Sequence, residues 1–154
     1  MKHLKYLTMC LLAVVLAVSC SRSDSGNSLT GKWQQTVTED GTMAVSTYDF
    51  KDNGKLTQTL TMKSETPAIE IDAEGTCDYV YTGDTITFKF SATDFNFKKF
   101  MIEGVGEDII ETAMDNMKAE MTNVEQRFTD VRIEGDKLTA TFEGQEVTFQ
   151  RIAD

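Results

Sequence analysis

Residues 55–62, KLTQTLTM, and residues 85–90, TITFKF, decide the fold class of this chain. In each stretch the apolar residues fall on one face of an extended strand: Leu56, Leu60 and Met62 in the first, and Ile86, Phe88 and Phe90 in the second. The opposite face carries mainly threonine and lysine. Alternation of this kind is typical of antiparallel strands with one face buried and the other in water.

The same period of two continues along most of the chain from Gly31 onward. Nine runs are predicted to be strands: 31–38, 43–50, 55–62, 68–72, 76–82, 85–91, 128–134, 137–143 and 146–152. An up-and-down barrel whose first and last strands pair antiparallel needs an even number of strands. Eight remain if the run 68–72 drops out, and ten result if residues 94–102 add a strand. The sequence therefore predicts an antiparallel up-and-down barrel of 8–10 strands, with a β-sandwich as the alternative.

Short turns join several of these runs. Gly83-Asp84 and Gly135-Asp136 each form a two-residue connection, and a glycine in the first position supplies the positive φ that tight hairpins prefer. Asp52-Asn53-Gly54 marks another turn rather than a calcium loop, because Leu60 stands where the loop's glutamate is required. These turns favour consecutive antiparallel hairpins.

One segment departs from the alternation and predicts a helix over about 106–125. Its apolar residues follow the three-and-four spacing of an amphipathic helix: Ile109, Ile110, Ala113, Met114, Met117, Met121 and Val124. The outside of the barrel, its open mouth or another protein has to cover this face. A helix at the mouth would act as a lid, with Gly104 and Gly106 as hinge candidates.

Two groups of side chains are candidates for lining a ligand site. They are aromatic residues of the strand faces and methionines of the helix: Tyr48, Phe50, Tyr79, Tyr81, Phe88, Phe90, Met114, Met117 and Met121. Methionine suits surfaces that repack around varied ligands. The alternative is that the aromatic residues fill the barrel and the methionines fill the core beneath the helix.

The motif GKW at 31–33 opens the first strand, and Arg151 lies in the last strand, EVTFQRI. A G-x-W motif with an arginine near the end of the final strand resembles the lipocalin-like (calycin) barrels, most of all the short bacterial lipocalin-like lipoproteins. The resemblance covers residues 29–92 and 128–152; the inserted helix departs from the family's order, in which the helix follows the last barrel strand. It implies that Trp33 and Arg151 pack together and close one end of the barrel, where cation–π attraction contributes about 0.5–2 kcal/mol.

The first twenty residues, MKHLKYLTMCLLAVVLAVSC, predict export. Lys2 and Lys5 precede an apolar run at 7–18, which is shorter than the ~20 residues that a membrane span needs. The end of the run, AVSC at 17–20, resembles the lipobox of bacterial lipoproteins, with alanine where the family usually has leucine. The resemblance implies cleavage before Cys20 and lipid attachment to it. The alternative is an ordinary cleaved signal that leaves Cys20 as a free thiol.

The chain thus divides into a lipoprotein signal peptide (1–19), a flexible polar tether (20–28) and a lipocalin-like barrel domain (29–154). Acyl chains on Cys20 make the lipid membrane an expected partner. Ser21 is not the aspartate that marks inner-membrane retention in enteric lipoproteins. We therefore expect the cell envelope, at the outer membrane and facing the periplasm, with surface display as the alternative.

The composition argues against several classes of function. The formal net charge is -10, and loss of the signal peptide makes it about -12, so we expect no nucleic-acid partner. The one histidine, His3, lies in the signal peptide, and the mature chain has no imidazole for acid–base catalysis or metal binding. We expect no enzyme activity, no metal and no cofactor. Cys77 shares a face with two tyrosines and is expected to be buried and inert.

Two functions remain open from the sequence. The barrel binds a small apolar or amphipathic ligand, or it is filled and acts as a non-catalytic interaction, inhibitor or scaffold module whose protein partner is unknown. A pocket of about 300 Å³ or more would favour the first.

Overall fold

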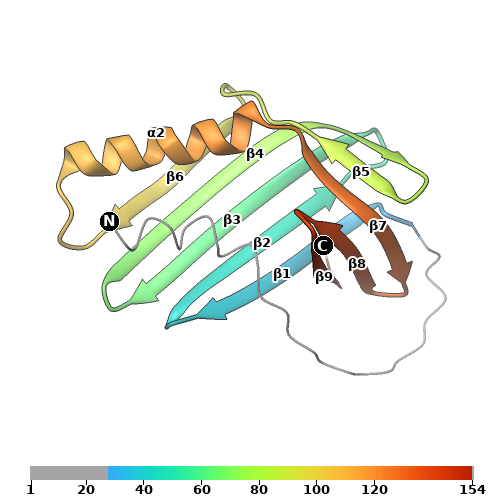
Figure 1. The fold of residues 1–154 in the computed structure, drawn as a ribbon, viewed down its shortest axis with the longest axis horizontal. Coiled ribbons are helices and arrows are strands. Elements are labelled where there is room, and N and C mark those ends of the chain that lie inside the picture. The colour runs from blue at the N-terminus through green and yellow to red at the C-terminus, as the bar shows by residue number, and fades with distance from the viewer. Residues whose placement is uncertain (1–27, 154) are drawn as a thin grey trace.

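The computed structural model describes residues 28–153, which form nine strands and one helix (Figure 1). In chain order they are β1 (Gly31–Glu39), β2 (Thr42–Phe50), β3 (Lys55–Glu65), β4 (Ala68–Thr82), β5 (Thr85–Phe88), β6 (Phe95–Ile102), α2 (Glu107–Asn123), β7 (Gln126–Glu134), β8 (Lys137–Phe142) and β9 (Gln145–Ile152). Every strand pairing is antiparallel.

Eight of these strands close into a barrel. The ring runs from β1 through β2, β3, β4, β5, β7, β8 and β9 back to β1. The pairing that closes it sets Trp33 opposite Arg151. The expected fold class, a closed antiparallel barrel with one inserted helix, is confirmed, and it is consistent with a lipocalin-like barrel.

The number eight arises because the runs at 68–72 and 76–82 are one strand, β4. Gly75 does not break this strand; a Cβ there would lie 2.7 Å from the ring of Phe95 and 2.8 Å from that of Phe90. Glycine is therefore required by the close approach of two aromatic rings rather than by a turn. Residues 95–102 do form a strand, β6, but it pairs with the first half of β4 and lies outside the ring.

The barrel is closed at one end and flared at the other. β1 pairs with β2 along nine residues, but it pairs with β9 only from Lys32 to Gln34. Beyond that point β1, β2, β3, β4 and β6 continue together past β7, β8 and β9 as a half-shell (Figure 1). We call the end that holds Trp33 and Arg151 the closed end, and the half-shell the flared end.

Inward-facing residues alternate with outward-facing ones along the strands, and the inward-facing residues form one hydrophobic cluster at each end of the barrel. The closed-end cluster is large and aromatic, and it includes Trp33, Tyr48 and Phe128. The flared-end cluster is smaller: Ala44, Met62 and Ile71 are buried, and Ile69, Phe97, Phe100 and Met117 pack against them.

The helix α2 spans Glu107–Asn123, so the expected helix over about 106–125 is confirmed. It lies along β6 at the flared end (Figure 1). Glu107 and Asp108 occupy its first turn, where the helix dipole favours negative charge. Ala113 and Thr122 are buried, while the three methionines are half-buried.

The predicted signal peptide (1–19), Cys20 and most of the tether lie outside the described residues. Within residues 28–153, no helix has both the length and the hydropathy needed to cross a bilayer.

Candidate functional site

The closed end is held by a clamp of three residues, Gly31, Trp33 and Arg151. The guanidinium carbon of Arg151 lies 4.1 Å from the centre of the Trp33 ring. Its two terminal nitrogens donate to main-chain oxygens, Nη1 to Thr30 O and Nη2 to Ser28 O, each at 2.7 Å. One arginine therefore joins the last strand to the chain segment that leads into the first.

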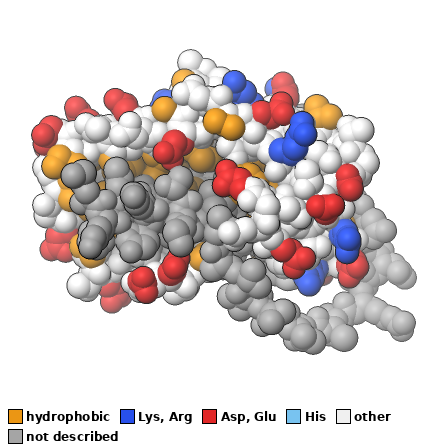
Figure 2. All heavy atoms as spheres, in the orientation of Figure 1, with side chains coloured by type: hydrophobic (Ala, Val, Ile, Leu, Met, Phe, Trp, Pro, Cys, Tyr) orange, Lys and Arg blue, Asp and Glu red, His pale blue; other side chains and the backbone are white. Residues whose placement is uncertain are grey.

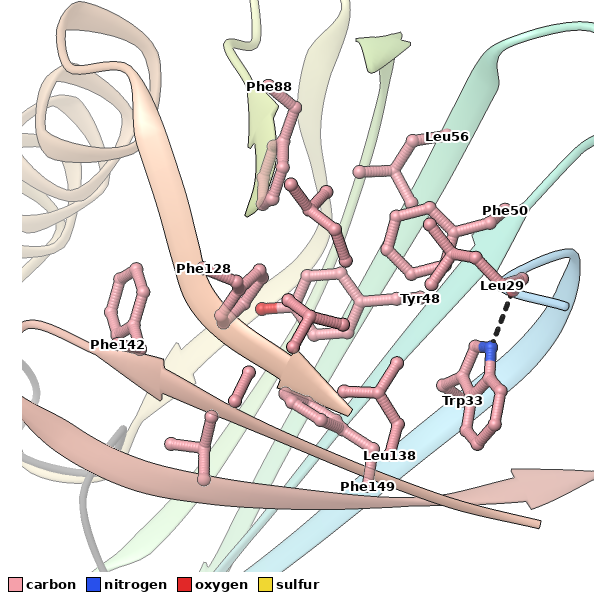
Figure 3. Close-up of a cluster of buried hydrophobic side chains, with 14 of the residues drawn as sticks. Leu29, Trp33, Tyr48, Phe50, Leu56, Phe88, Phe128, Leu138, Phe142 and Phe149 are labelled. Atoms are coloured by element: carbon pink, nitrogen blue, oxygen red, sulfur yellow. Dashed lines mark hydrogen bonds between the residues drawn. The ribbon is translucent and has the colours of Figure 1, made fainter. Parts of the chain in front are cut away.

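Gly31 is required by the same geometry. Its φ is +122°, and a Cβ there would lie 2.7 Å from Arg151 Nη1. Trp33 is fully buried, and its Nε1 donates to Leu29 O at 2.7 Å, as Figure 3 shows. The structure thus brings together the pair that the G-x-W resemblance placed at barrel closure. Arg151 donates its hydrogen bonds to main-chain oxygens, which every residue has. The sequence therefore could not have identified these acceptors.

Aromatic side chains fill the interior of the closed end. The Tyr48 ring makes edge-to-face contacts with Phe128 at 5.7 Å and with Phe149 at 5.4 Å between ring centres. Figure 3 shows these rings converging from opposite sides of the barrel. The cavity that remains beside Trp33 measures about 10 Å³. Aliphatic and aromatic side chains line it, including that of Tyr48. A ligand pocket needs hundreds of Å³, so the space left at this end is far smaller than a ligand requires.

The aromatic ligand-lining candidates divide between this interior and the protein surface. Tyr48, Phe50, Phe88 and Phe90 are buried in the packed closed-end cluster. Tyr79 is half-buried, packs edge-to-face on Phe50 at 5.0 Å and donates to Lys51 O at 2.9 Å. Tyr81 is exposed beside the β4–β5 turn.

The flared end is apolar but less completely packed. One cross-strand row sets Val37, Ala44, Met62, Ile71 and Phe100 side by side on the inner face. Met117 of α2 packs against this cluster, and Met121 packs against the closed-end cluster. Met114, Met117 and Met121 are all half-buried. The methionine candidates therefore do not share one site, because Met117 packs at the flared end and Met121 at the closed end.

A polar band on the inner face separates the two clusters. Gln58 is 5% exposed, and its Nε2 donates to the Tyr48 hydroxyl at 3.0 Å, but its Oε1 has no hydrogen-bond partner. Burial raises the pKa of Tyr48 far above its usual range, so this hydroxyl stays protonated. In the next row toward the flared end, Gln35 and Ser46 face inward and are half-buried.

Sequence reasoning did not select this polar band. The available signal was in KLTQTLTM itself, where Gln58 interrupts the apolar face formed by Leu56, Leu60 and Met62. A polar residue at an inward position of a strand is costly unless it has a partner, and it therefore indicates a hydrogen bond or a polar site inside the barrel.

Cys77 is nearly buried at the closed end. Burial raises the pKa of its thiol to about 11, so the reactive thiolate is scarce at neutral pH.

A separate polar hollow of about 160 Å³ lies on β7, β8 and β9 and is lined by residues that include Asp130, Arg132 and Glu146. In the part of the chain that the structure describes, no three His, Cys, Asp or Glu side chains are arranged to hold a metal ion.

Acidic side chains are spread over the face shown in Figure 2, with hydrophobic side chains visible between them.

No protein-family model matches this chain, and no curated protein matches it either. Function is therefore argued from the geometry and chemistry of the flared end and the clamp.

Proposed function

We propose that this protein is a membrane-anchored, lipocalin-like lipoprotein of the bacterial envelope that binds a small apolar or amphipathic molecule at the flared end. The observation that supports this is the contrast between the two ends. The closed end is filled to a residual cavity of about 10 Å³, whereas the small apolar cluster of the flared end is bordered by half-buried side chains, among them Ile69, Phe100 and Met117 of α2. Binding there leaves the closed end free to supply stability.

The helix is the element that adapts to the ligand. Met117 packs against the flared-end cluster, and its unbranched, polarisable side chain can repack around guests of different shape. Gly104 has a φ of +76°, and the chain turns there between β6 and α2. Movement about this turn would open the space between α2 and the inner face of β2 and β3.

Ligand binding is tested with the Cys20→Ala variant of the full chain, which is released in soluble form if Cys20 carries the anchor. The probe is N-phenyl-1-naphthylamine, a neutral apolar dye whose fluorescence rises in apolar surroundings. Met117→Ser should weaken probe binding several-fold because it removes apolar contact from the site. The matched control is Met43→Ser on the outer face of β2, where Met43 is 41% exposed; it should leave probe binding unchanged.

A specific result would contradict the proposal. If Met117→Ser lowers the free energy of unfolding but leaves probe binding unchanged or stronger, the helix is only part of the core. Absence of probe binding to the parent protein at any concentration below dye aggregation would also exclude an apolar site at the flared end.

The anchor is tested separately by fractionation. The wild-type protein should sediment with membranes, and Cys20→Ala should move to the soluble periplasmic fraction. We expect the wild-type protein in the outer-membrane fraction, with protease accessibility on whole cells distinguishing surface display from a periplasmic orientation. Wild-type protein found entirely in the soluble fraction would exclude lipid anchoring.

A second function, a non-catalytic interaction module, is favoured by the filled closed end and by two exposed apolar residues near opposite ends of α2. Ile109 is 59% exposed and Val124 is 57% exposed. If a protein partner or a second copy covers the flared end, Ile109→Ser should break that complex in size-exclusion chromatography. A monomer that binds the probe would instead favour ligand binding.

A further inference from the structure

We infer that the flared end selects amphiphiles with an uncharged, hydrogen-bond-donating head group, such as an alcohol or a monoglyceride, over fatty acids. This inference rests on the proposed ligand-binding function and names the chemical class of ligand within it. It follows from the polar band and from the charges that line the inner face.

The first observation is the unpartnered amide oxygen of Gln58. A buried acceptor without a donor costs free energy, and nearly all such groups in folded proteins are paired. Gln58 is 5% exposed, and its only hydrogen bond is the one to the Tyr48 hydroxyl. A ligand that brings an O–H or N–H group to this oxygen would satisfy it.

The second observation is the position of the band. Gln58 pairs in register with Tyr48, while one row further toward the flared end Ser46 pairs with Gln35 on one side and with Leu60 on the other. The next row is apolar, with Val37, Ala44 and Met62. The polar groups therefore lie at the inner end of an apolar lining, which fits a polar head bound inside and an alkyl chain along α2.

Space at this level comes from small side chains. Ser46 and Ala73 occupy the same row on β2 and β4, next to the row of Gln58, where the rings of Phe90 and Phe95 cover Gly75. Gln35, Ser46 and Leu60 are half-buried, so solvent reaches this row although the row that contains Gln58 is closed. A head group that enters this row reaches the amide once Gln58 or Leu60 shifts, because Gln58 itself is 5% exposed.

The third observation is charge. The inner faces of β1, β2, β3, β4 and β6 carry no lysine or arginine, and Glu39 at the rim is acidic and half-buried. An ionised carboxylate buried without a cation is strongly disfavoured. On α2 the one lysine, Lys118, is half-buried and is the cation that a fatty acid would have to use.

The experiment compares two ligands of equal chain length, 1-decanol and decanoate, at pH 8. Each displaces N-phenyl-1-naphthylamine from the Cys20→Ala protein, and the concentrations for half-displacement are compared. Decanol should act at a concentration about tenfold lower or better, the size of effect that one buried hydrogen bond gives. Gln58→Leu, which replaces the amide by an apolar group of similar size, should raise the concentration of decanol needed for half-displacement several-fold while the dye still binds.

The outcomes separate this inference from the proposed function. Equal displacement by the two ligands, or displacement by decanol that is unchanged in Gln58→Leu, would overturn the head-group inference while leaving apolar binding in place. Tighter binding of decanoate that is lost in Lys118→Gln would overturn it in favour of a fatty-acid site. If the dye itself does not bind the parent protein, the proposed function fails and this inference fails with it. Circular dichroism of each variant checks that the barrel is folded.

Discussion

Replacing Arg151 by methionine should destabilise the barrel strongly, because this side chain ties the last strand to the segment that leads into the first. The substitution keeps an unbranched apolar stem but removes the charge and both hydrogen bonds, to Ser28 O and Thr30 O, each 2.7 Å long. Hydrogen bonds that involve a charged group contribute roughly 1.5–3 kcal/mol each. The Arg151 side chain is 20% exposed, so water recovers part of this loss. We expect a loss of about 2–3 kcal/mol in the free energy of unfolding.

The assay is urea unfolding of the Cys20→Ala protein, followed by far-UV circular dichroism. Circular dichroism is preferred because Trp33 is the chain's only tryptophan, and substituting it removes the fluorescence signal. Arg151→Lys is the informative control: it keeps a cation but cannot span two carbonyl oxygens, and it should lose about half as much. Gly31→Ala adds a Cβ 2.7 Å from Arg151 Nη1 at a φ of +122°, and it should cost about 1–3 kcal/mol.

A double-mutant cycle tests whether Arg151 and Trp33 act together. Trp33→Leu removes the ring over which the guanidinium lies at 4.1 Å, and it also removes the Nε1 donor to Leu29 O. Since both residues hold the segment that leads into β1, the coupling should reach about 1 kcal/mol or more. Additivity within about 0.3 kcal/mol would refute the reasoning, because it would mean that neither the ring contact nor the shared segment matters.

Two further predictions concern the closed-end interior. Gly75→Ala should destabilise the protein by about 1–3 kcal/mol in the same urea assay, because its Cβ would overlap the rings of Phe90 and Phe95; wild-type stability would show that the rings move aside freely. Cys77 should react slowly with a thiol reagent in the folded protein at pH 8 and quickly once it is unfolded in urea. Its pKa is raised from 9.0 to about 11 by burial, so its contribution to stability is complete below pH 9 and is lost as the pH rises toward 11; a stability that does not fall over this window would contradict the assignment.

Local patterns were sufficient to predict the strands and the helix. Alternation in KLTQTLTM and TITFKF identifies β3 and β5, and the three-and-four spacing around Met117 identifies α2. The G-x-W motif and Arg151 also located the closed end correctly in the chain order, because the first and last strands of a closed ring are neighbours. These features depend on residues close together in the sequence or on topology alone.

The break predicted near Gly75 did not occur, and the reason is a long-range contact. Glycine in a strand signals either a bend or the close approach of another group, and local sequence does not distinguish them. Here the rings of Phe90 and Phe95 fill the space above Gly75, and both come from segments after β4. The strand therefore continues to Thr82, and the ring holds eight strands rather than ten.

The flared end could not be predicted because it depends on where strands stop pairing. β1 has nine residues in register with β2 but only three in register with β9, and no local pattern in β1 marks that change. The same limit applies to the polar band, since the sequence shows that Gln58 points inward but not that its Oε1 is left without a partner. An inward-facing residue belongs to a filled core where another strand lies opposite it, and to an accessible site where the opposite strand has ended.

The unequal strand lengths connect the stability of the barrel with the proposed binding at the flared end. A ring of eight strands held by three pairs of residues at the β1–β9 seam needs the arginine clamp and the aromatic packing to stay closed. The longer strands β3 and β4 then extend past β7, β8 and β9, and their inner faces require another cover, which α2 provides along β6. If the two ends are this distinct, substitutions at Arg151 should change the free energy of unfolding without changing ligand selectivity, whereas Gln58→Leu should weaken the binding of decanol. A variant of Arg151 that folds normally but loses the preference for decanol would show that the ends are coupled and that the closed end takes part in binding.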